Sequence, residues 1–170
     1  MTADQQMVAW LRFQILARKA AAEAATEGPW EVTGQDGLDD AWQIYGGVDK
    51  NGGTLVDWNS GEPVEVPVRH RVATLNYEDG GGVWRREDAD HIVLNQPRDT
   101  IARCEAELRI LNDYDDFARV AADHPSPPGD PSWAELSAGI LGDVIGDLAY
   151  AYRHRPGFDS SWFISAPEDV

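Results

Sequence analysis

The chain has 170 residues, of which 42% are apolar and 26% charged, and it contains seven Trp. This length suits one core of ordinary size, and so many large aromatic side chains are not expected in a disordered protein. The 14 Lys and Arg against 30 Asp and Glu give a formal net charge of −16, which repels phosphate backbones and anionic membranes. We therefore expect a single folded domain, residues 1–170, that binds neither nucleic acid nor membranes directly.

The sequence also bears on the compartment. No run approaches the roughly 18 apolar residues of a membrane span, and the first residues lack the basic start and apolar run of a signal peptide. We therefore predict a cytoplasmic protein.

The lone cysteine, Cys104, cannot form an internal disulfide, and its position in a helical apolar pattern predicts a packing role.

An amphipathic helix is predicted over residues 3–25. Val8, Leu11 and Ile15 fall on one stripe of this segment, with polar side chains opposite. Gly28-Pro29 must end the helix, because proline lacks the amide donor and restricts the residue before it.

Residues 30–78 have the composition of an antiparallel sheet, with short β-branched and aromatic runs between Gly, Asn and Asp. Strands are predicted at 30–33, 41–45, 54–58 and 64–76. Asn51-Gly52-Gly53 is expected to form a hairpin turn, since glycine readily adopts the positive φ angles that such turns require.

Helices return over residues 88–121. A short helix is predicted at 88–94, and a longer one begins near Pro97, whose ring suits the first turn. Its apolar stripe is Ile101, Cys104, Leu108 and Leu111. A proline-rich linker, residues 122–131, follows.

The last helix is predicted over residues 132–153, opening with a capping box from Ser132 to Glu135. Its expected buried residues are Leu136, Ile140, Val144 and Leu148. Its glycines, Gly139, Gly142 and Gly146, are expected to permit close approach to another element. A tail anchored by Phe158 and Trp162 completes an α+β fold in which a small antiparallel sheet packs against about three helices.

Three motifs carry a family resemblance: Gly28-Pro29-Trp30, the run from Asp88 to Ile92, and the run from Leu148 to Trp162. Together they resemble small proteins of actinobacteria and actinophages catalogued as domain of unknown function 6221. The chain departs from the family's His-Pro pair because Arg155 stands between His154 and Pro156. The resemblance implies a compact cytoplasmic accessory protein, without implying an activity.

Histidines and carboxylates suggest one chemical hypothesis. Histidine titrates near neutral pH and often binds metals, so two histidines with carboxylates would suffice for an open metal site if the fold brought them together. The candidates are Asp90, His91, Glu105 and His154. The sequence favours a structural or helix-capping role for them, and no cofactor is expected apart from a divalent metal in this hypothesis.

The aromatic residues of the sheet region suggest another role. Trp42, Trp58 and Trp84 are the candidates to face a partner, although the alternative that they complete the core is favoured. The main functional prediction is a non-enzymatic module that binds a protein partner or a second copy of itself. The alternatives are a metal-dependent hydrolase and a phage inhibitor that mimics nucleic acid.

Overall fold

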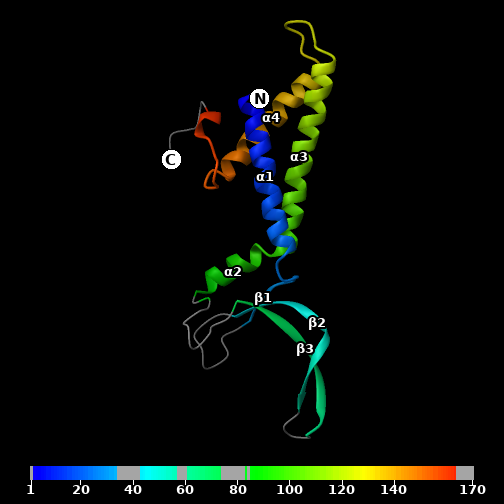
Figure 1. Ribbon diagram of the computed structural model, residues 1–170, viewed down its shortest axis with the longest axis vertical. Helices are drawn as coiled ribbons and strands as arrows, with labels where there is room; N and C mark the ends of the chain where they lie inside the picture. The colour runs from blue at the N-terminus through cyan, green and yellow to red at the C-terminus, as the bar shows by residue number, and fades with distance from the viewer. Residues whose placement is uncertain (1, 34–42, 57–60, 74–82, 84, 164–170) are drawn as a thin grey trace. The chain divides into compact units, whose positions relative to one another are not determined.

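The computed structural model describes residues 2–33, 43–56, 61–73, 83 and 85–163 (Figure 1). These residues fall into two compact units. The helical unit comprises Met1–Ala20 and Ala102–Val170, and the sheet unit comprises Ala21–Ile101. Among the described residues, no helix is long and apolar enough to pass through a bilayer.

The described elements occur in the order α1 (Ala3–Glu23), β1 (Glu31–Thr33), β2 (Gln43–Val56), β3 (Pro63–Ala73), α2 (Arg86–Leu94), α3 (Pro97–Asp123), α4 (Trp133–Ala151) and η1 (Ser160–Trp162). An α+β composition is thus present. The described residues contain four α-helices, one more than the predicted total of about three, and the two helices predicted at 88–94 and from Pro97 are present as α2 and α3.

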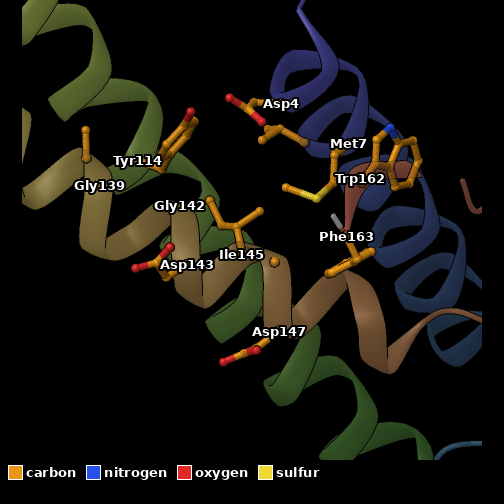
Figure 2. Close-up of a pocket in the computed structure, with 13 residues that line it drawn as sticks. Asp4, Met7, Tyr114, Gly139, Gly142, Asp143, Ile145, Asp147, Trp162 and Phe163 are labelled. Carbon is orange, nitrogen blue, oxygen red and sulfur yellow. The ribbon is translucent and has the colours of Figure 1, made fainter. Parts of the chain in front are cut away.

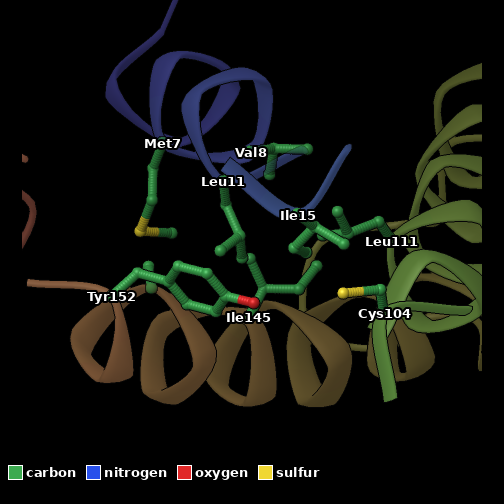
Figure 3. Close-up of a cluster of buried hydrophobic side chains, with 9 residues drawn as sticks. Met7, Val8, Leu11, Ile15, Cys104, Leu111, Ile145 and Tyr152 are labelled. Carbon is green, nitrogen blue, oxygen red and sulfur yellow. The ribbon is translucent and has the colours of Figure 1, made fainter. Parts of the chain in front are cut away.

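The core of the helical unit is built from α1, α3 and α4. Leu11 and Ile15 of α1 are completely buried, which confirms the predicted stripe, and Cys104 and Leu111 of α3 are equally inaccessible. Figure 3 shows these side chains converging between the helices. Burial also raises the pKa of the Cys104 thiol, which keeps it protonated and supports its packing role.

The buried face of α4 differs from the prediction. Leu136, Ile140 and Val144 are exposed at 53%, 66% and 37%, whereas Ile145 and Ala149 are completely buried. Apolar residues occupy most of the circumference of this helix, so the 3.6-residue period fits more than one face. The face that is buried carries Ala134, Ile145 and Ala149, and the last two belong to the core cluster with residues of α1 and α3.

The start of α4 confirms the capping box. The backbone amide of Glu135 donates to the Ser132 hydroxyl at 3.2 Å, and the backbone amide of Ser132 donates to the Glu135 carboxylate at 2.7 Å. Two amides that the helix leaves without a partner are thereby satisfied. This local signal fixes the helix start, but it does not specify which face is buried.

The sheet unit contains an antiparallel sheet in the order β1-β2-β3. The predicted hairpin turn at Asn51-Gly52-Gly53 is wrong, since these residues lie within the continuous strand β2. From Asp49 to Gly53 the pairing partner moves only from Val68 to Val66, so the extra residues are absorbed as an irregularity of the strand. Glycines suit such bulges as well as turns, which explains the error.

Trp30 links the sheet to α2. Its indole packs against the buried cluster of Ile44, Val83 and Ala89, and its Nε1 donates to the carbonyl oxygen of Thr26 at 2.9 Å. These contacts give Trp30 of the Gly28-Pro29-Trp30 motif an architectural role in the sheet unit.

Candidate binding surfaces of the helical unit

A groove of about 660 Å³ opens on the helical unit between α1, α3, α4 and the residues of η1. Figure 2 shows how its labelled side chains surround the opening. The apolar part of the lining includes Met7 and Val8 of α1, Ile145 of α4, and the aromatic rings of Trp162 and Phe163. We call this cavity the acidic groove, because its charged lining residues are all carboxylates.

Three aspartates give the acidic groove its charge. Asp4 lies in the first turn of α1, and Asp143 and Asp147 occupy successive turns of α4. Within the part of the chain that the structure describes, none of the three forms an ion pair. Burial and the nearby charges of Asp4 and Asp115 raise the pKa of Tyr114, so its hydroxyl stays a hydrogen-bond donor at the groove.

The glycines of α4 line the acidic groove instead of permitting a tight helix contact, so the prediction of close approach is wrong. A Cβ atom at Gly139 would meet no atom within 4 Å, and one at Gly142 would lie 3.8 Å from Tyr114 Cε2. At Gly146 the nearest atom, from Phe163, would lie 3.9 Å away. These are ordinary van der Waals distances, so the missing side chains leave open space that becomes part of the groove.

A line of exposed apolar side chains runs along α4. Trp133 is 71% exposed, although its ring stacks edge-on against Phe117 with centroids 4.9 Å apart. Together with Leu136, Ile140 and Val144 it forms an exposed apolar surface on α4. Single exposed apolar residues are ordinary on protein surfaces, but several at helical spacing are typical of an interaction surface.

The C-terminal tail supplies part of the groove and is anchored as predicted. The indole of Trp10 lies 5.7 Å from the ring of Phe158 and 5.3 Å from that of Trp162, measured between centroids. Trp10 Nε1 also donates to the carbonyl oxygen of Pro156 at 3.0 Å. These contacts hold the segment that places Trp162 and Phe163 at the acidic groove.

The residues predicted to bind a partner, Trp42, Trp58 and Trp84, lie outside the described residues. Their role as an interface therefore stays a prediction.

Sequence reasoning missed Asp143, Asp147 and Phe163 as residues of a shared site. The spacing of the three glycines along α4 was the available signal, since small side chains on one helix face leave room beside the helix.

The four candidate metal ligands have other surroundings. Asp90 accepts from Arg86 Nε at 2.9 Å, and Glu105 pairs with Lys19 at 3.2 Å. His91 is exposed on α2, and His154 is exposed beside a second cavity. Among the described residues, no group of three or more His, Cys, Asp or Glu side chains is placed to hold a metal ion. The metal hypothesis gains no geometric support and stays a prediction.

Comparisons with known proteins give one match. No curated protein and no solved structure matches the chain. A family model does match, over residues 4–164, and its description is a family of unknown function, DUF6221. The match spans both units and includes the residues that line the acidic groove. The chain therefore belongs to the DUF6221 family.

Proposed function

We propose that the chain is a non-enzymatic protein-binding module whose acidic groove takes a basic, amphipathic segment of a partner protein. The observation that carries this proposal is the pairing of an apolar, aromatic floor with three aspartates in one cavity. The actinobacterial or phage source implied by the resemblance would make the partner a protein of the same cytoplasm.

Charge supports a partner of opposite sign over a second copy of the chain. With a formal net charge of −16, two copies repel each other at long range, whereas a segment rich in Lys or Arg is attracted. Asp4, Asp143 and Asp147 would meet its cations at the groove. Complementary charge of this kind accelerates association and selects the correct partner.

The floor of the groove supplies apolar contact area. Met side chains adapt to varied partners, and aromatic rings are enriched among residues that dominate binding energy. Met7, Trp162 and Phe163 combine both properties in one place. The volume of about 660 Å³ lies within the range of about 300–1,000 Å³ typical of ligand pockets, which is enough for a few side chains.

The direct test uses a helix-forming peptide of Leu and Lys, with a Leu and Glu peptide of the same length as its counterpart. Fluorescence anisotropy should show that the Leu and Lys peptide binds and that the Leu and Glu peptide does not. The double variant Asp143→Asn/Asp147→Asn should weaken it by about tenfold, which corresponds to about 1.4 kcal/mol. The matched control Asp113→Asn/Asp123→Asn makes the same charge change at exposed positions of α3 outside the groove lining.

The control separates a groove from a general effect of charge. Equal weakening in both double variants would show that net charge alone attracts the peptide, and the proposal would fail. Gly142→Leu is a third variant. Its new leucine side chain should fill the groove and abolish binding without changing the charge of the chain. Capture of a protein from nuclease-treated lysate by the wild type and the control, but not by Gly142→Leu, would then identify the natural partner.

A further inference from the structure

A second cavity of the helical unit is lined by a concentration of arginines. Its volume is about 480 Å³, and it lies among α1, α3 and the end of α4. Arg18, Arg103 and Arg155 line it together with Glu107, Tyr152 and His154. We call this cavity the arginine pocket. Three arginines gather here in a chain that has only 14 Lys and Arg in total.

Two of these arginines differ from Arg12 and Arg119 of the same unit. Arg12 pairs with Asp115 at 2.7 Å, and Arg119 pairs with Asp116 at 3.2 Å. By contrast, the side chains of Arg103 and Arg155 make no hydrogen bond or ion pair with any described residue. Their guanidinium groups keep all five N–H donors available to a ligand.

The wall of the arginine pocket is fixed by a buried hydrogen-bonded network. Arg18 donates from one terminal nitrogen to the Tyr152 hydroxyl at 3.2 Å, and that hydroxyl donates to Glu107 Oε2 at 2.8 Å. Tyr152 and Glu107 are only 7% and 8% exposed. The network orients Arg18 and satisfies the carboxylate, so a ligand meets a preorganised site at this wall.

The charge of the arginine pocket matches a doubly charged anion. Three guanidinium groups against one carboxylate leave a formal excess of two positive charges, with His154 left out of the count. A phosphate monoester carries about −1.5 to −2 at pH 7 and offers several acceptor oxygens. Guanidinium groups bind such oxygens in pairs, which makes arginine well suited to phosphate recognition.

We infer that the arginine pocket binds the phosphate group of a small phosphorylated molecule. Its volume suits a ligand of that size, since small-molecule pockets span about 300–1,000 Å³. A nucleic acid is disfavoured as the occupant, because its many phosphates would meet the net charge of −16 beyond the pocket. A single phosphate group near the pocket is attracted chiefly by the local arginines, since screening limits the reach of distant charges.

The test is a titration of the full chain with glycerol 3-phosphate at constant ionic strength, followed by amide chemical shifts in NMR spectra. We expect saturable shifts near Arg18, Arg103 and residues 152–155, with a Kd of about 1 mM or tighter. Glycerol, which has the same carbon skeleton without the phosphate, should cause none. The absence of saturable shifts with glycerol 3-phosphate would overturn the inference.

Variants show whether the arginines act through position or through charge alone. Arg103→Gln/Arg155→Gln should raise the Kd by about tenfold or more, since two charged hydrogen-bonding groups are removed. Arg109→Gln/Arg119→Gln makes the same charge change outside the pocket lining and should leave the Kd within about twofold. Equal weakening in both would overturn the inference. Arg103→Lys/Arg155→Lys should bind at an intermediate strength, because lysine keeps the charge without the paired donors.

Discussion

The hydroxyl of Tyr152 donates a 2.8 Å hydrogen bond to Oε2 of Glu107, which joins α3 to the C-terminal cap of α4. Both side chains are buried at this point, and Arg18 of α1 donates to the same hydroxyl. One phenolic oxygen thus connects the three helices of the unit. The network closes the core on one side and forms the wall of the arginine pocket on the other.

Removal of this hydroxyl is expected to destabilise the protein. Tyr152→Phe leaves the buried Glu107 carboxylate without its donor, at a cost of about 1–3 kcal/mol in the free energy of unfolding. Urea denaturation followed by circular dichroism measures the change. Tyr150→Phe serves as the control, because the Tyr150 hydroxyl makes no hydrogen bond with the described residues, and it should change stability by less than about 0.5 kcal/mol. Equal effects of the two variants would contradict this account.

Stability should fall at alkaline pH because of the same residue. Burial raises the pKa of Tyr152 from 10.0 to about 12, and the contact with Glu107 adds to the rise while Arg18 opposes it. The folded state holds the neutral phenol, so its contribution is complete below the unfolded-state pKa of 10.0 and is lost as pH rises through about 12. As pH rises from 10.0 to about 12, the denaturation midpoint of the wild type should therefore decline. In Tyr152→Phe the decline should be shallower, and identical slopes would argue against the shifted pKa.

The capping box predicts a measurable effect at the start of α4. Ser132→Ala removes the acceptor of the Glu135 amide, and we expect a loss of about 1 kcal/mol. Ser137→Ala, inside the same helix, is the matched control, and the high helix propensity of alanine should leave it neutral or slightly stabilising. Thermal denaturation of the two variants provides the comparison, and a control as destabilising as Ser132→Ala would exclude the cap as the cause.

Acid should remove the contribution of the same cap. The pKa of Glu135 is lowered from 4.5, chiefly by hydrogen bonds from Ser126 and Ser132. Its ionised form therefore stabilises the fold above that ordinary value, and the contribution disappears as pH falls through the lowered folded-state pKa. Glu135→Gln, which cannot ionise, should remove this part of the acid dependence. A profile that matches the wild type would refute the assignment.

Two glycines should respond in opposite directions to alanine. Gly142→Ala has room, with Tyr114 Cε2 3.8 Å from the new Cβ, and should gain about 0.5–1 kcal/mol from helix propensity. Gly46→Ala should be destabilising, because its Cβ would overlap the indole of Trp30. Parallel chemical denaturation of the two variants tests both signs. A stable Gly46→Ala protein would show that Trp30 is not packed over this strand.

Much of the local structure was readable from the chain. Apolar spacing located α1 and α3, and the Ser132 and Glu135 pair located the start of α4, because these signals act within a few residues of each other. The family resemblance rested on short motifs, and the match over residues 4–164 confirms it. The predicted anchor residues of the tail, Phe158 and Trp162, also meet a common partner in Trp10.

Tertiary packing decided what local pattern left open. The sequence of α4 permits more than one buried face, and packing of the helical unit buries the side that carries Ala134, Ile145 and Ala149. The glycines at 51–53 suited both a turn and a bulge, and strand pairing decided between them. The acidic groove and the arginine pocket join residues far apart in the chain, such as Asp4 with Asp147 and Arg18 with Arg155. No local signal encodes such pairs, since only the packing of α1, α3 and α4 brings them together.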